Sequence, residues 1–133
     1  MQSLTVAATV DNLDRVTAFV DAFLEEQDCP MKTQMQIDLC VEEIFVNIAH
    51  YAYPDKDGEA QVLISETDGI VELTFIDSGI PYDPLKKEDP DITLSSQERQ
   101  IGGLGVFLVK KNMDTVTYRY ENSQNILAMT KAI

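Results

Sequence analysis

Residues 32–51 read KTQMQIDLCVEEIFVNIAHY, and this stretch decides how the rest of the chain is interpreted. Its apolar side chains recur at intervals of three and four residues, which predicts one long helix with a stripe facing the core. That stripe consists of Ile37, Cys40, Val41, Ile44 and Ile48. Because a helix advances about 100° per residue, a second set of side chains gathers on another sector. The set is Glu43, Asn47, His50 and Tyr51, and its polar and aromatic character predicts one wall of a functional site.

Strand and helix patterns surround this helix in a simple order. Residues 2–8 predict an edge strand, and a first helix is predicted to end near residue 27, with Asp11 or Asn12 as its N-cap. Two hairpins are predicted: residues 61–66 and 70–76 around Asp68-Gly69, and residues 115–121 and 125–131 around residues 122–124. Residues 104–112 predict a third, short helix.

This order of elements predicts the fold class α+β. We expect a two-layer sandwich in which three helices cover one face of a mixed, mostly antiparallel sheet. A length of 133 residues suits one domain, residues 1–133, because two separate cores would each be marginal. The irregular stretch at about residues 77–100 is long for so small a domain, and such loops tend to be functional lids.

The charge of the chain limits its partners. With 10 Lys and Arg against 23 Asp and Glu, the net charge is −13, which argues against direct binding to nucleic acid. Cys29 and Cys40 form no CxxC pair and no metal cluster with His50, which favours free thiols in a reducing compartment. Neither a membrane-spanning run nor a signal-peptide start is evident, so we expect a cytoplasmic protein that does not contact a membrane.

The octapeptide Asp77-Ser78-Gly79-Ile80-Pro81-Tyr82-Asp83-Pro84 directly follows a predicted strand. An Asp-x-Gly at a strand end places one carboxylate at the tip, beside a permissive backbone. Such an acid can accept hydrogen bonds from an exocyclic amine and from a ring-bound water, as adenine recognition requires. An Asx-type turn capped by Asp77 is an equally good structural explanation.

Gly102-Gly103-Leu104-Gly105 opens the last helix, which continues as an apolar run over residues 106–109. Glycines at a helix start let backbone N–H groups approach phosphate oxygens, and the helix dipole adds a favourable potential. The pattern is neither a Walker motif nor the dinucleotide-binding Gly-x-Gly-x-x-Gly. A flexible loop is the alternative.

Together, Glu43-Ile-Phe-Val-Asn47 with Ala52-Tyr53, the Asp77 octapeptide and the glycine stretch resemble three known sequence boxes. They are the N, G1 and G2 boxes of the gyrase and histidine-kinase type ATPases. The chain is most similar to the bacterial anti-sigma-factor serine/threonine kinases, because Met113-Asp114 and the closing strands also match. The resemblance covers about residue 36 to the C-terminus. It implies a Bergerat-type ATP-binding fold with an ATP lid at about residues 85–101.

The resemblance also implies a role for each site residue toward ATP and Mg²⁺. Asn47 would hold Mg²⁺, and Glu43, one turn earlier, would be the catalytic base that acts on a serine hydroxyl or a water. Asp77 would recognise the adenine amino group, and Gly79 would leave room for the base. The set of cofactor-binding residues is completed by Tyr82, Arg99, Gly102, Gly103, Leu104 and Gly105.

Two alternatives concern the helix over residues 32–51. Glu42 is a rival for the role of base, although the four-residue spacing to Asn47 favours Glu43. The family often has His four residues after the Asn, where Tyr51 stands here, so we expect His50 to be a helix-edge or partly packed residue and not a catalytic group.

The cation that faces the terminal phosphate also has alternatives. An arginine close before the second glycine box often has this role in the family, and the candidate is Arg99, three residues before Gly102. Lys110 and Lys111 are alternative cations. They equally fit the positively charged last turn of a helix.

The function implied by the resemblance is that of an ATP-binding anti-sigma regulatory factor with serine/threonine protein kinase activity. Such a protein would phosphorylate an anti-sigma antagonist protein, sequester a sigma factor and form a homodimer. The alternatives are a nucleotide-gated protein-binding module without kinase activity, a slow stand-alone ATPase and a purely structural domain.

Overall fold

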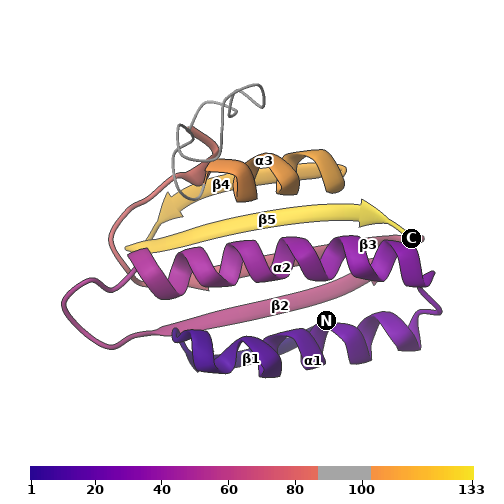
Figure 1. Ribbon diagram of the computed structural model, residues 1–133, viewed down its shortest axis with the longest axis horizontal. Coiled ribbons are helices and arrows are strands. Elements are labelled where there is room, and N and C mark those ends of the chain that lie inside the picture. Colours follow the sequence, from indigo (N-terminus) through magenta and orange to yellow (C-terminus); the bar gives the residue numbers. More distant parts are fainter. Residues whose placement is uncertain (87–102) are drawn as a thin grey trace.

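The computed structural model describes residues 1–86 and 103–133. Within them, three α-helices cover one face of a single five-stranded sheet, which confirms the predicted two-layer α+β sandwich (Figure 1). The helices are α1 (Leu13–Glu26), α2 (Met31–Tyr51) and α3 (Gly103–Asn112). The strands are β1 (Gln2–Ala7), β2 (Glu59–Thr67), β3 (Ile70–Asp77), β4 (Thr115–Glu121) and β5 (Gln124–Ala132). None of the described helices is long and apolar enough to cross a membrane.

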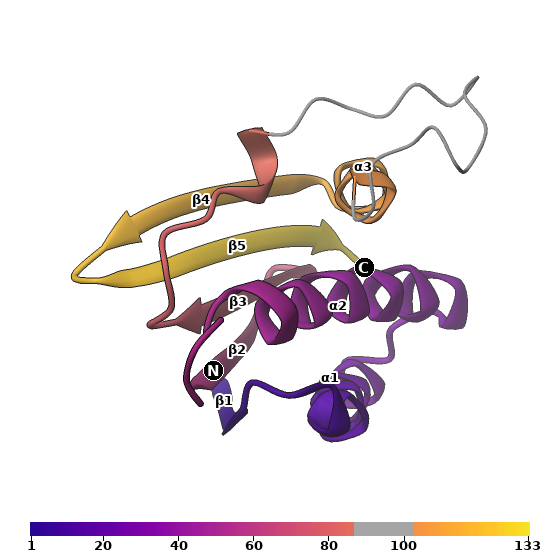
Figure 2. The same cartoon turned by 60° about the vertical axis from the view of Figure 1, so that its left-hand side comes forward.

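The strands are ordered β1-β2-β3-β5-β4, and each of these four neighbouring pairs is antiparallel. The described part of the sheet therefore lacks the parallel pair that a mixed sheet would contain. The chain passes through α3 and β4 before β5 inserts beside β3, so β5 runs against β3 (Figure 2). This insertion places the start of β5 next to the end of β3, with Asp77 paired to Asn125.

Both hairpin turns occur where the sequence predicts them, and each contains two residues. Asp68 and Gly69 have φ values of 53° and 80°, and Asn122 and Ser123 have φ values of 54° and 62°. Positive φ at both central residues is typical of the type I′ turn, whose twist matches that of the flanking strands. The second turn is one residue shorter than predicted, because Gln124 already belongs to β5.

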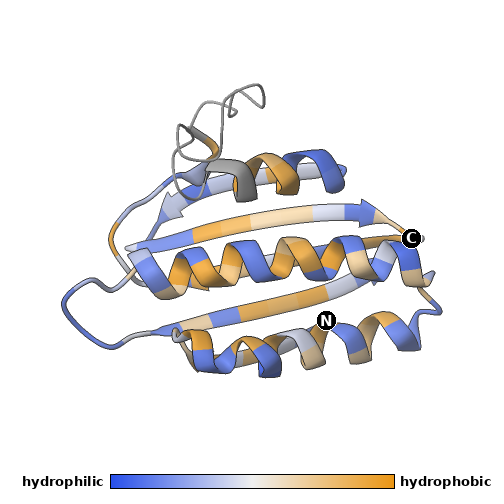
Figure 3. Ribbon diagram, viewed as in Figure 1, coloured by the Kyte–Doolittle hydropathy of each residue, from blue (hydrophilic) through white to orange (hydrophobic). Residues whose placement is uncertain are grey.

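The core lies between the sheet and the inner sides of α1 and α2. The predicted stripe of α2 is buried from Ile37 to Ile44, and Ile48 is partly buried against it. Phe45 and Gln34 are also buried, which the stripe did not predict. The cause is that α2 contacts α1 as well as the sheet, so its buried sector is wider than one stripe. Figure 3 shows apolar and polar residues alternating along α1 and α2, as expected for helices that pack by one side.

The start of α1 differs from the prediction. A short 3-10 turn, Val10–Asn12, precedes the helix, and Asn12 stands at the N-cap position without a side-chain cap hydrogen bond. Its Nδ2 instead donates to the carbonyl oxygen of Ala7 at 2.9 Å. Asn12 therefore ties the helix start to the end of β1.

Two acids meet where α1 and α2 pack. Burial, a hydrogen bond to Asp21, and the negative charges of Asp21 and Glu25 raise the pKa of Asp38 to about 8. An Asp in an unfolded chain has a pKa of about 3.9. The folded protein therefore retains a proton that the unfolded chain has lost, so stability falls as the pH rises from about 4 to about 8.

Replacing Asp38 with Asn should stabilise the protein at neutral and alkaline pH, because the amide supplies a donor toward Asp21 without taking up a proton. After allowance for solvent screening, we expect a gain of about 1–2 kcal/mol near pH 8 and none below about pH 4. Urea unfolding of both proteins across this pH range measures the difference. Asp14→Asn, at an exposed acid of α1, is the charge control. If the unfolding free energies of the native protein and of Asp38→Asn changed in parallel with pH, the retention of this proton by Asp38 would be contradicted.

Candidate functional site

Asp77 is a buried carboxylate at the end of β3, with 6% of its surface exposed. Its Oδ1 accepts hydrogen bonds from the Gly79 amide at 2.9 Å and from Asn125 Nδ2 at 2.8 Å. Burial raises the pKa of Asp77, and these two hydrogen bonds partly offset the rise. None of the described residues donates to Oδ2, so one oxygen of the carboxylate is available to a ligand. The Asx turn and an available carboxylate oxygen therefore coexist at this position.

The loop after β3 is fixed against the end of α2. The amide of Ile80 donates to the carbonyl oxygen of Ala52 at 2.9 Å, and the amide of Ser78 donates to the Tyr53 hydroxyl at 2.8 Å. The same hydroxyl donates to the carbonyl oxygen of Glu59 at 2.6 Å. The Ala52-Tyr53 pair of the sequence motif thus holds the loop to both α2 and β2.

Gly79 lies so close to α2 that a side chain has no space there. A Cβ at this position would lie 2.2 Å from the carbonyl oxygen of Ala52 and 2.6 Å from its Cβ. This close approach is a packing reason for glycine. Its role in leaving room for a purine remains a prediction.

Gly79→Ala should destabilise the protein by about 1–3 kcal/mol, because the backbone of Ala52 or of the loop must shift to accept the methyl group. Denaturant unfolding measures the change. Ser78→Ala is the matched control, since Ser78 is exposed and makes its hydrogen bond through the backbone. Equal stability of the two variants would contradict this explanation.

A buried amide on β5 connects the parts of the site, and the sequence did not reveal it. Nδ2 of Asn125 donates to Asp77 Oδ1 and, at 2.8 Å, to the carbonyl oxygen of Ile80. Its Oδ1 accepts from the Tyr82 amide at 3.1 Å and from the Tyr118 hydroxyl. All four hydrogen-bonding positions of this amide are used, so Asn125 holds Asp77 in one orientation.

One signal could have identified Asn125. The inward-facing positions that follow along β5 are Leu127 and Met129, both buried and apolar. A polar residue at the first position of this series needs hydrogen-bond partners in the core. The sequence alone does not name them, because the partners belong to β3, to β4 and to the loop after β3.

A small cavity of about 40 Å³ adjoins Asp77 and is lined in part by Ile44, Ile48, Tyr82 and Tyr118. Tyr82 also packs on Tyr51 at the end of α2, with ring centroids 5.9 Å apart. Ligand pockets usually measure about 300–1,000 Å³, so this cavity must enlarge before it can hold a purine.

Glu43 and Asn47 lie one turn apart on α2, and both are half-buried. Burial and the negative charge of Glu42 raise the pKa of Glu43. Glu42 is exposed and lines a groove between α1 and α2 with Asp38. Asn47, nine residues after Asp38, points about 180° away from it on an ideal helix. Of the two candidate bases, Glu43 is therefore the one on the side of Asn47.

The glycine box is described only in part. Arg99, Gly102 and most of the expected lid lie outside the described residues. Helix α3 begins at Gly103, so the remaining box residues Gly103, Leu104 and Gly105 lie within its first turn. The first four N–H groups of a helix have no partner within it, and these residues supply three of them. Helix α3 packs beside α2, the helix that carries Glu43 and Asn47 (Figure 1).

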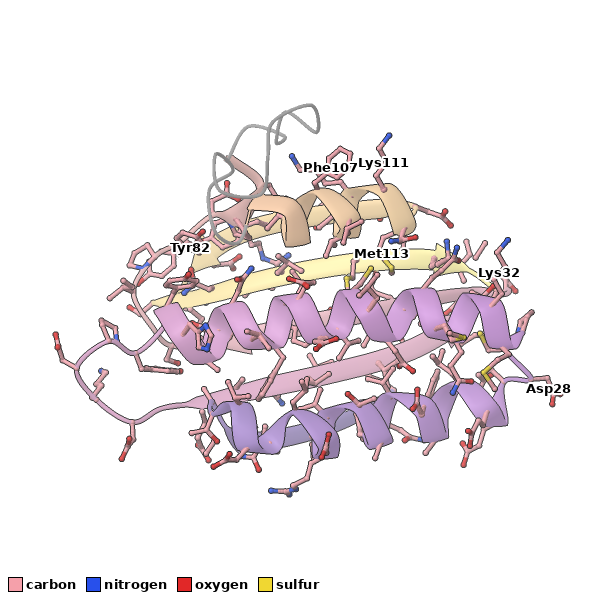
Figure 4. The ribbon with its side chains drawn as sticks, viewed as in Figure 1. Asp28, Lys32, Tyr82, Phe107, Lys111 and Met113 are labelled. Carbon is pink, nitrogen blue, oxygen red and sulfur yellow. The ribbon has the colours of Figure 1, made fainter. Side chains whose placement is uncertain are left out.

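The remaining polar candidates lie away from these groups. His50 is exposed and its ring contacts Tyr51 edge-on, as expected for a helix-edge residue. Lys110 and Lys111 are in the last turn of α3, at the opposite end from Gly103. The ammonium group of Lys111 lies 5.4 Å from the centre of the Phe107 ring (Figure 4). The two lysines thus form the positively charged helix end.

Residues 6–131 match the family model of the histidine kinase-like ATPase domain. The chain is 27% identical over 100 residues to the serine/threonine-protein kinase BtrW of Bordetella bronchiseptica, which covers 74% of this chain and 70% of BtrW. It is 28% identical over 102 residues to the serine-protein kinase RsbW of Listeria monocytogenes, which covers 73% of this chain and 64% of RsbW.

The fold is similar to solved structures of two larger proteins. The RsbU and RsbW domains of Rv1364c from Mycobacterium tuberculosis match with a TM-score of 0.65 and 14% identity, over 99% of this chain and 32% of that one. The histidine kinase AdeS of Acinetobacter baumannii matches with a TM-score of 0.50 and 11% identity, over 99% and 68% of the two chains. These likenesses agree with the fold, and the family model spans nearly the whole sequence. The chain therefore belongs to the family of histidine kinase-like ATPase domains.

Proposed function

We propose that this chain is an ATP-binding anti-sigma regulatory factor with serine/threonine protein kinase activity, which phosphorylates an antagonist protein and sequesters a sigma factor. Family membership implies ATP binding, and the names of BtrW and RsbW support a kinase. The observation that carries the proposal is the Asp77 carboxylate, held by Asn125 and Gly79 with Oδ2 unoccupied by any described donor.

In this proposal the nucleotide is recognised at both of its ends. Oδ2 of Asp77 accepts a hydrogen bond from the adenine amino group, beside Gly79 and Tyr82. The amides of the first turn of α3 donate to the phosphates, because those N–H groups have no partner within the helix. Gly102 is proposed to add a further amide. Arg99 is proposed to face the terminal phosphate.

Asn47 is the proposed ligand of Mg²⁺, and its amide oxygen is a hard ligand of the kind this ion prefers. The described residues contain no group of three His, Cys, Asp or Glu side chains that could hold a metal ion by themselves. This fits Mg²⁺, which usually binds through one or two side chains, substrate phosphates and water. When bound, the ion neutralises phosphate charge, which a chain of net charge −13 needs.

Glu43 is the proposed catalytic base. As the serine oxygen of the antagonist forms its bond to the γ-phosphorus, Glu43 accepts the hydroxyl proton and ADP departs with the bond electrons. Burial and the negative charge of Glu42 raise the pKa of Glu43. The raised pKa lies closer to the pH at which the enzyme works, as suits a general base.

We also propose a homodimer, for which the centre of the outer face of the sheet offers an uncharged area between charged residues such as Glu72 and Arg119. Two uncharged cross-strand rows lie at its centre. The first consists of Gln61, Ile76 and Ile126, and the second of Leu63, Thr74 and Ala128. Most surfaces of so acidic a chain repel a second copy, and these uncharged rows contribute no such repulsion. Light scattering should report twice the monomer mass of 14.9 kDa.

The kinase proposal is tested by incubating the protein with γ-labelled ATP and a serine-bearing antagonist protein. We expect label on a serine of the antagonist. Tight ATP binding without transfer would instead indicate a nucleotide-gated binding module, and phosphate release without a partner would indicate a slow ATPase. No thermal shift with ATP and Mg²⁺ would leave only a structural domain.

A further inference from the structure

The outward side of α2 carries a second apolar stripe. Met31, Met35 and Leu39 recur every four residues, so they lie on one side of the helix. Their side chains are 65%, 65% and 37% exposed, unlike those of the core stripe. Methionine is flexible and polarisable, and it is frequent at surfaces that accept partners of different shapes.

This stripe borders a groove of about 430 Å³ between α1 and α2. Leu13 of α1 with Met35 and Leu39 of α2 supplies its apolar lining. Asp14, Asp38 and Glu42 supply carboxylates to the same groove, and no lysine or arginine is among the described residues that line it. The groove therefore combines an apolar lining with the negative charges of Asp14 and Glu42, beside the protonated Asp38.

Two further acidic side chains lie close to Asp38 of the groove. Asp21 and Glu25 of α1 face Asp38, and the Oδ1 atoms of Asp21 and Asp38 are buried without a hydrogen-bond partner among the described residues. A cationic side chain placed in the groove would reduce the repulsion among these acids.

We propose that this groove, with the stripe of Met31, Met35 and Leu39, docks an amphipathic helix of a protein partner whose apolar face is flanked by Lys or Arg. A groove between two helices is suited to a third helix. The stripe extends about 12 Å, so two turns of the partner helix cover it. The inference goes beyond the proposed function and does not depend on nucleotide.

The charges argue against other occupants. Nucleic acid and anionic membranes are repelled by the carboxylates of Asp14 and Glu42, which line the groove. A second copy of this chain would place one acidic groove against another acidic surface. A basic helix satisfies both the apolar stripe and the acids.

Docking should also depend on pH. A cation beside Asp38 favours its charged form, so the partner displaces the proton that Asp21 and Glu25 help Asp38 to retain. The affinity should therefore rise between about pH 6 and about pH 8. Two other titratable groups lie near Asp38. Glu42 lines the same groove, and burial together with the charge of Asp38 raises the pKa of Cys29.

The test uses two synthetic peptides of about 14 residues with leucines at helical spacing, one with lysines and the other with glutamates at the remaining positions. Each is titrated into the nucleotide-free protein at about 0.15 M salt, with amide chemical shifts as the readout. The groove variant is Met35→Ser with Leu39→Ser. The matched control is Ile70→Ser with Tyr120→Ser, two exposed apolar residues outside the groove.

We expect the lysine peptide to shift amides of α1 and α2, and the glutamate peptide to shift none. The groove variant should bind about tenfold more weakly, and the control within about twofold of native. Asp38→Asn should remove most of the pH dependence. Equal binding by the groove variant and the native protein, or shifts outside α1 and α2, would overturn the proposal. A change in the molecular mass of the groove variant by light scattering would also overturn it, because a second copy would then be the occupant.

Discussion

Asp77→Asn should lower the affinity for ATP by about 10- to 150-fold, the effect of one hydrogen bond to a charged group. Oδ1 of residue 77 must still accept from Asn125 and Gly79, so the new amide turns its NH₂ group toward the ligand. That donor then faces the adenine amino group, which is also a donor. The variant should remain folded, because burial already disfavours the charged form of Asp77.

The same substitution should reverse the preference between two purines. Inosine triphosphate carries a carbonyl oxygen where ATP carries its amino group, so it accepts a hydrogen bond from the new NH₂ group. Competition binding with the two nucleotides measures the ratio of affinities for the native protein and for Asp77→Asn. An unchanged ratio would show that Asp77 does not contact the purine edge.

Glu43→Gln should reduce phosphate transfer to the antagonist by about 10²- to 10⁴-fold, the usual contribution of a general base. The affinity for ATP should change little, because the proposed contacts of Glu43 are with the serine hydroxyl. Initial rates with labelled ATP at saturating antagonist measure the effect. The base acts only when it is ionised, and the pKa of Glu43 is raised. As the pH is lowered, the transfer rate should therefore begin to fall at a higher pH than it would with an exposed glutamate as the base.

Glu42→Gln is the matched control for Glu43. The two acids are adjacent in sequence, but Glu42 is exposed and lines the groove toward α1. We expect this variant to retain most of its transfer rate. A larger loss with Glu42→Gln than with Glu43→Gln would reverse the assignment of the base.

Local patterns account for the parts of the fold that the sequence predicted well. The 3.6-residue period of residues 32–51 needs no knowledge of the rest of the chain, and α2 begins within one residue of its predicted start. The Asp68-Gly69 turn is equally local, because both residues tolerate the positive φ that a type I′ turn requires.

Features that depend on packing between distant segments were not predictable. Asn125 reaches Asp77 only because β5 inserts beside β3, a pairing that the sequence does not specify. Phe45 and Gln34 are buried because α1 covers a second side of α2. Asn12 forms no cap because its side chain bonds to the end of β1.

The sequence indicated residues of the candidate site more fully than the hydrogen bonds that connect them. Asp77, Gly79 and Tyr82 do meet at one end of the sheet, within one hydrogen-bond network. The clamp of Tyr53 on Ser78 was not foreseen, because a tyrosine after a helix has no pattern that marks its partner. The roles of Asn47 and Glu43 toward a nucleotide stay predictions.

The central claim is that α2, the end of β3 and the start of α3 together bind one ATP with its Mg²⁺. The most direct test is the ATP affinity of the native protein and of Asn47→Ala, each with and without Mg²⁺, with Gln36→Ala on the same helix as the control. We predict that Mg²⁺ tightens binding about tenfold or more in the native protein and in Gln36→Ala, and that Asn47→Ala does not respond to it. An equal response to Mg²⁺ in all three proteins would contradict the account.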